Sequence, residues 1–181
     1  MRPLTAGVLA AVGCAVTTVA CSSGGSTGSA STPTATPAPT PTVLARAAFV
    51  QQANAACKNA TTGQDQLFSG VSDNPSPAQV SSLVHQTVAL YTAYRTQLDP
   101  LIASQADAAD LRAKWIRYDE LDIADLRHLL QPLDKALGEH DTTAARRAAG
   151  VIENDQTNNG AKAVAFLRAQ GLTDCATLEA G

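Results

Sequence analysis

The sequence predicts an all-α fold, and three observations on the residues after 42 lead to that expectation. Apolar residues recur there at spacings of three and four, the period of an amphipathic helix. No stretch alternates apolar and polar residues as a half-buried strand does, and no Asn-Gly pair separates two apolar runs as a hairpin turn does. Aromatic residues make up only 4% of the chain, so the core must consist mainly of Ala, Leu, Val and Ile. We expect an antiparallel up-down-up-down four-helix bundle.

The first helix is expected from about Val43 to near Thr61. Its apolar residues lie along one side at helical spacing, which predicts a buried face. Gly63 is expected to stop it, because glycine favours the end of a helix over its interior.

The second helix has a clear start signal. Ser76 can cap it, Pro77 suits the first helical position, and Gln79 completes a Ser-x-x-Gln capping box. Proline disfavours a helical conformation in the residue before it, so we expect this helix to end near Asp99-Pro100.

The third and fourth helices are expected from about Asp107 to Gly138 and from the cap residue Asp141 to Gly171. Pro132 removes a backbone hydrogen bond, which predicts a kink or a break in the third helix. That helix carries a nearly continuous apolar stripe. The stripe consists of Leu111, Trp115, Tyr118, Leu121, Leu126, Leu129, Leu133 and Leu137.

Residues 1–20 have the order of a lipoprotein signal peptide. A positive start at Arg2 is followed by an apolar stretch and by the small residue Ala20 directly before Cys21. We expect cleavage before Cys21 and a lipid on its sulfur. Two alternatives stay open: ordinary small-residue cleavage at the same place, and lipidation of Cys14, which would leave a shorter apolar region.

Residues 21–42 are expected to be a disordered tether between the lipidated Cys21 and the helical domain of residues 43–181. After Cys21 the stretch is nearly all Ser, Gly, Thr, Ala and Pro and carries no charge, and such a composition cannot bury a core. Its Pro-rich second part favours an extended spacer.

The helical domain keeps two cysteines, Cys57 and Cys175, if Cys21 is lipidated and Cys14 is removed with the signal peptide. An even cysteine count in an exported protein favours a disulfide, so we expect Cys57 to pair with Cys175. The pairing requires the tail after Gly171 to run back along the first helix. A reactive or metal-binding pair is the alternative, but no basic residue or Cys-x-x-Cys motif surrounds either cysteine.

The two ends of the chain resemble a known group of proteins. Residues Phe49–Cys57 read FVQQANAAC and open the domain, while Gly171–Ala176 read GLTDCA and close it. With Cys21 and the tether, they look like uncharacterised small helical lipoproteins of high-GC Gram-positive (actinobacterial) bacteria. The resemblance implies an address on the outer face of the cell membrane and supports the disulfide, and it implies no activity.

Candidate chemical sites are few. Asp125 and His128 have the acid-x-x-His spacing of di-iron bundles, but the partner ligands that such a centre needs are missing. An acidic solvated face with Asp125 paired to His128 is the preferred interpretation. His85 and His140 lack a partner that would make either a metal or haem ligand. We therefore expect no catalytic residue, no metal and no cofactor.

Two functions from different classes remain. The first is a membrane-tethered interaction or binding module that presents a helical face to another envelope protein or to the cell wall. The second is a carrier or sensor of a small apolar ligand, haem or metal. Trp115, Tyr118 and Tyr94 would line the carrier's cavity. No motif predicts an enzyme, and a formal net charge of -3 with no basic patch argues against nucleic acid. A large internal cavity would favour the carrier, whereas a solid core with an exposed apolar patch would favour the interaction module.

Overall fold

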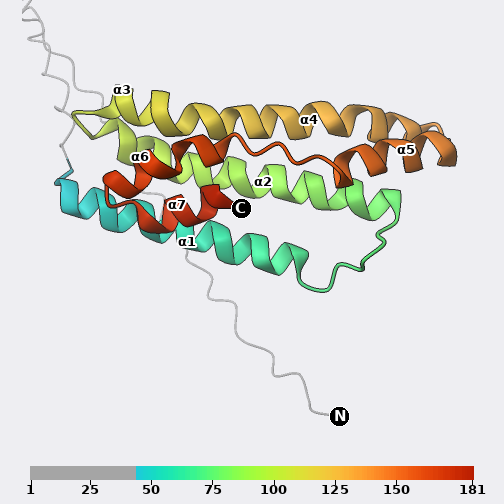
Figure 1. Cartoon of the computed structure of the whole chain (residues 1–181), viewed down its shortest axis with the longest axis horizontal. Helices are drawn as coiled ribbons and strands as arrows, with labels where there is room; N and C mark the ends of the chain where they lie inside the picture. Colours follow the sequence, from blue (N-terminus) through green and yellow to red (C-terminus); the bar gives the residue numbers. More distant parts are fainter. Residues whose placement is uncertain (1–43) are drawn as a thin grey trace, which may run out of the picture. The chain divides into compact units, whose positions relative to one another are not determined.

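The computed structural model describes residues 44–181, and every regular element in that range is a helix (Figure 1). The predicted all-α class is therefore confirmed for the domain. The expectations for the signal peptide, Cys14, Cys21 and the tether lie outside the described residues. Within the described range, no helix is long and apolar enough to cross a membrane.

Three long helices form the frame: α1 (Arg46–Phe68), α2 (Pro77–Ala103) and α4 (Arg117–Gly138). Figure 1 shows each running opposite to the one before it. The expected stop of the first helix at Gly63 is wrong, because α1 continues through it. A Cβ atom on Gly63 would lie 2.9 Å from Cδ1 of Leu90, so this glycine lets α1 and α2 approach closely.

The predicted capping box at the start of α2 is confirmed. Ser76 Oγ accepts a hydrogen bond from the Gln79 backbone N–H at 3.3 Å, and Gln79 Oε1 accepts one from the Ser76 N–H at 2.8 Å. The expected end at Asp99-Pro100 is wrong, since α2 continues to Ala103. Leu98 and Ile102 are fully buried on either side of the proline, and their burial offsets the hydrogen bond that Pro100 cannot make.

The predicted third helix is built in three pieces. A short helix, α3 (Ala108–Leu111), is followed by a π-helical turn at Arg112–Ile116 and then by α4. The π turn places an extra residue in the helical path, which rotates the buried face of everything after it. Leu121 of the predicted stripe is exposed. The predicted break at Pro132 is not found, because α4 continues through it.

The expected single fourth helix is wrong. The structure has α5 (Thr142–Glu153), an irregular stretch over residues 154–159, a 3₁₀ turn (Gly160–Ala163), α6 (Val164–Ala169) and α7 (Thr173–Ala180). Figure 1 shows this part returning from α5 to the far end of the frame, where α7 lies beside α1.

The turn between α6 and α7 is formed at Gly171, a residue type that readily adopts the left-handed conformation found at helix ends. Gly171 has a φ of +76°, in the left-handed region. The N–H of Leu172 donates to the carbonyl of Leu167 at 2.9 Å, which closes α6 in a Schellman-type end. The chain then turns back, as the expected disulfide requires.

The predicted cysteine pair is brought together: Cys57 of α1 and Cys175 of α7 form a disulfide with Cα atoms 4.8 Å apart. Neither cysteine is exposed. Tyr94 Oη lies 3.3 Å from Cys57 Sγ and can donate to it. The disulfide thus lies inside the core and joins segments separated by 118 residues.

The buried apolar side chains form two clusters, which define two halves of the domain. The disulfide half contains α1, the second part of α2, α3, the π turn, α6 and α7. The capped half lies between the first part of α2, the second part of α4, and α5. Its buried members are Val80, Val84, Leu130, Leu133, Ala136, Ala145 and Ala149.

Candidate functional site

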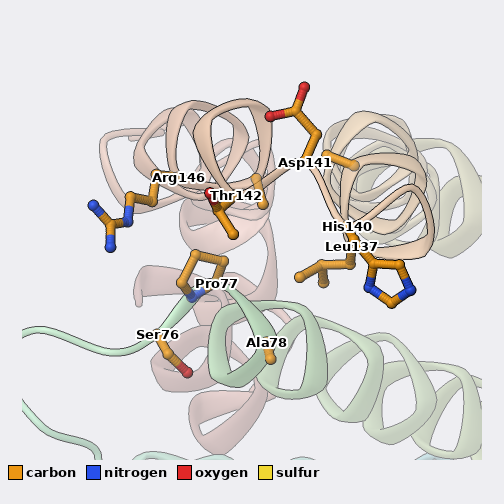
Figure 2. A pocket seen from close by; sticks show the side chains of 10 residues that line it. Ser76, Pro77, Ala78, Leu137, His140, Asp141, Thr142 and Arg146 are labelled. Carbon is orange, nitrogen blue, oxygen red and sulfur yellow. The ribbon is translucent and has the colours of Figure 1, made fainter.

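A cleft of about 300 Å³ lies where the start of α2 meets the turn between α4 and α5. Figure 2 shows Pro77 facing Thr142 across it, with the charged ends of Asp141 and Arg146 directed away from Pro77. His140, which has a φ of 57°, belongs to the turn. The polar groups around this cleft do not converge on a common point, as a catalytic site requires.

Asp141 has a structural role at the edge of that cleft. Its Oδ1 accepts hydrogen bonds from the backbone N–H groups of Thr143 at 3.0 Å and Ala144 at 2.9 Å. These bonds cap α5, as the sequence predicts for Asp141. The carboxylate is therefore engaged with the backbone and does not act on a ligand in the cleft.

The acid-x-x-His pair of α4 does not form the expected local contact. Asp125 Oδ2 accepts a hydrogen bond from Asn159 Nδ2 at 3.1 Å, whereas His128 is exposed. His85 instead lies 2.9 Å from Asp134 Oδ2, a contact that joins α2 to α4. The described residues contain no group of three His, Cys, Asp or Glu side chains that could hold a metal ion.

Two buried carboxyl groups, which we call the acid pair, meet in the disulfide half. Asp119 from the first turn of α4 is 1% exposed, and Glu179 from α7 is 4% exposed. Trp115 Nε1 donates to Glu179 Oε1 at 3.2 Å. Within the described range, no N–H or hydroxyl group donates to either oxygen of Asp119. A buried carboxyl without such a donor is costly when ionised.

The acid pair retains a proton to a higher pH than ordinary carboxyls do. Burial raises the pKa of Asp119 well above its usual range, and the charge of Glu179 and a hydrogen bond with it raise it further. Burial also raises the pKa of Glu179, while hydrogen bonds with Asp119 and Trp115 oppose that rise. The hydrogen bond between the two carboxyls therefore acts in opposite directions, raising the pKa of Asp119 and opposing the rise in the pKa of Glu179.

The nearest cation is mostly engaged elsewhere. Arg95 donates from Nη2 to Glu120 Oε1 at 3.0 Å and from Nη1 to the Ile116 carbonyl at 3.3 Å. Its charge lowers the pKa of Asp119, but burial outweighs that influence. The acid pair is therefore not a satisfied buried ion pair.

The irregular stretch after α5 is fixed against α4 beside the acid pair. Asp122 Oδ1 accepts from the backbone N–H of Asn159 at 2.8 Å and from its Nδ2 at 2.9 Å, and Oδ2 accepts from the Gly160 N–H at 2.9 Å. A Cβ atom on Gly160 would collide with Glu179 Oε2. A side chain at Gly160 would displace the Glu179 carboxyl group, so the segment and the acid pair are positioned together.

Sequence reasoning missed the acid pair, although one signal for it was present. Asp119 lies four residues after Trp115 and four before Ile123, and all three are buried on one helical face. An acid in line with two apolar residues suggests a buried carboxyl. Glu179 carries no comparable signal, because it lies in α7, within the tail after Gly171 for which we predicted no helix.

No family model, curated protein or solved structure was found to match this chain.

Proposed function

We propose that this chain is an exported lipoprotein, anchored to the outer face of the cell membrane by acyl chains on Cys21. In this proposal residues 1–20 are the signal peptide, the stretch over residues 21–42 is the spacer, and the helical domain is a non-enzymatic binding module that contacts a protein of the cell envelope. The observation that carries the proposal is the Cys57–Cys175 disulfide.

The disulfide supports an oxidising compartment. Structural disulfides persist outside the cytoplasm and are rare in the reducing cytosol. Cys57 and Cys175 are fully buried beside Phe49 and Trp115 in one apolar cluster, a setting that suits a permanent crosslink better than a reactive thiol. Export through a signal peptide that ends before Cys21 would deliver the chain to such a compartment.

The core favours a surface-binding module over a carrier of an internal ligand. Trp115 and Tyr94, which would line a carrier's cavity, are buried in the apolar cluster of the disulfide half. An open groove of about 280 Å³ lies instead between α4 and α5, with mainly apolar walls that include Leu129 and Val151. Val151 is 55% exposed. Apolar side chains left open to water favour protein contact.

The anchor can be tested with the full-length protein produced in an actinobacterial host. Wild type should incorporate an alkyne-labelled fatty acid and partition into the detergent phase of a Triton X-114 extraction. Cys21→Ala should lose both the label and the partitioning, because the thiol that receives the lipid is gone. Intact mass before and after reduction should also show two hydrogens gained at Cys57 and Cys175.

Cys14→Ala is the matched control, since it removes the rival acceptor cysteine and should behave as wild type. Retention of the label by Cys21→Ala, or its loss from Cys14→Ala, would contradict anchoring at Cys21. Free thiols at Cys57 and Cys175 in the exported protein would remove the observation on which the proposal depends.

A further inference from the structure

The first turn of α7 is held firmly. The Cys57–Cys175 disulfide fixes it to α1. Asn54 of α1 adds two hydrogen bonds: its Oδ1 accepts from the Asp174 backbone N–H at 3.1 Å, and its Nδ2 donates to the Gly171 carbonyl at 3.0 Å. A covalent bond and contacts with the backbone therefore set the position of this turn.

The last turn of α7, residues 177–180, has a weaker attachment. Leu178 is buried in the apolar cluster of the disulfide half. Among the described residues, only one hydrogen bond joins this turn to another segment, and it runs from Trp115 Nε1 to Glu179 Oε1. Glu179 Oε2 packs against Gly160. The position of the last turn thus depends on the Glu179 carboxyl, which belongs to the acid pair.

The charged and titratable groups around the acid pair do not compensate two negative charges. Burial dominates the pKa of both carboxyls; the charge of Asp122 adds to the rise, and Arg95, which donates to Glu120, opposes it. Burial and the nearby acids raise the pKa of Tyr91 and Tyr94, so both phenols stay neutral. On the other elements packed against α7, the charged side chains are exposed or paired: Lys58 and Asp65 of α1, Lys162 of the 3₁₀ turn and Arg168 of α6 are exposed, and Arg46 of α1 pairs with Asp107.

A cavity of about 210 Å³ adjoins Glu179 and connects it to water. Phe68, which is 49% exposed, lines the same cavity. Asp125 and Asp155 are further carboxyls of its wall, and no Lys, Arg or His is among the described residues there. An ionised Glu179 can therefore become hydrated through this cavity, whereas the closed structure offers it no cation.

We propose that the last turn of α7 is a pH-sensitive latch. It stays closed over Trp115 while the acid pair holds a proton, and it opens when both carboxyls are ionised. Two like charges are costly in this buried place, where no N–H or hydroxyl group of the described residues donates to Asp119. Because the disulfide keeps Cys175 in place, the movement is a local opening of the residues after it. The latch does not depend on the lipid anchor, so the two proposals fail independently.

The test follows the fluorescence of Trp115, the only tryptophan in the chain, while the purified protein is titrated from about pH 4 to about pH 9. As the latch opens, the emission should shift to longer wavelength and acrylamide should quench it several-fold more strongly. The far-UV circular dichroism should be retained, because the long helices stay folded. If opening releases one proton, the ratio of open to closed forms should rise about tenfold per pH unit within the transition. Amide hydrogen exchange should speed up in residues 177–180 and not in α2 or α5.

Asp119→Asn should keep the latch closed over the whole titration, because the amide carries no charge and can donate to Glu179. Glu179→Gln should do the same and provides the test if Asp119→Asn does not fold, which thermal melts would show. Glu139→Gln is the matched control, because it removes an exposed carboxylate at the other end of α4 and should retain the wild-type transition. Three results would overturn the proposal: a Trp115 that stays protected throughout, an exposure of Trp115 that coincides with loss of the helical signal of the whole domain, or an unchanged transition in both acid-pair variants.

Discussion

The two halves of the domain are stabilised in different ways. The capped half packs aliphatic side chains between α2, α4 and α5, and two of these helices, α2 and α5, begin at side-chain caps from Ser76 and Asp141. The disulfide half contains the crosslink, the indole of Trp115 and the acid pair in one buried region. Local signals account for the first half, whereas the second depends on contacts between α7 and residues far away in the sequence.

The difference separates ordinary helix packing from a feature that needs a functional or energetic explanation. Burial of aliphatic side chains in the capped half lowers the free energy of the folded state, and the main opposing cost there is the loss of side-chain entropy. The disulfide half instead buries Asp119 and Glu179 without a dedicated cation, which opposes folding when both ionise. We infer that the disulfide offsets part of that cost by holding α7 in place.

Removing the disulfide should have the largest effect. The Cys57→Ser, Cys175→Ser double variant should lose about 5 kcal/mol of unfolding free energy, because the crosslink closes a loop of 118 residues in the unfolded chain. Urea unfolding followed by circular dichroism measures the loss. A loss under about 1 kcal/mol would mean that α7 is held by packing alone.

The acid pair should make the domain less stable as the pH rises. Burial raises the native pKa of Asp119 above that of an unfolded aspartate, so the stability it contributes is complete below about pH 4 and is lost as the pH rises through the native pKa. The free energy of unfolding should fall between about pH 4, where an unfolded aspartate ionises, and the native pKa of Asp119. Asp119→Asn should flatten this slope, because the amide does not ionise. Urea unfolding at a series of pH values measures this dependence of the unfolding free energy on pH.

Glu139→Gln is the control, since it removes an exposed carboxylate and should retain the wild-type slope. A wild-type stability that rises between these pH values, or a slope that Asp119→Asn leaves intact, would show that the acid pair ionises without cost. The comparison between the halves would then rest on the disulfide alone.

The helical class, the start of α2, the cap of α5 and the cysteine pair could all be predicted from the sequence. Each depends on local chemistry or, for Cys57 and Cys175, on a count of two cysteines. The helix ends at Gly63 and Pro100 could not, because close packing against Leu90 and burial of Ile102 override local preference there. Tertiary contacts decided both positions.

The acid pair and the contact of Asp122 with the stretch after α5 show a second limit of sequence reasoning. Asp119 is buried on the same face of α4 as Ile123, while Leu121 of the predicted stripe is exposed. Asp122 binds the backbone of Asn159 and Gly160, where we expected an uninterrupted helix. Both features join residues of different segments, and the period of one helix carries no information about such a contact.

The smallest effect is expected at the start of α2, in the capped half. Ser76→Ala removes the acceptor for the Gln79 N–H and should cost about 1 kcal/mol in urea unfolding. Ser82→Ala, on the exposed side of the same helix, should cost less, because alanine favours the helix interior. Since the cap and the acid pair lie in different halves, Ser76→Ala and Asp119→Asn should add to within about 0.5 kcal/mol. A larger coupling would mean that α2 transmits strain between the halves, and that they should be treated as one unit.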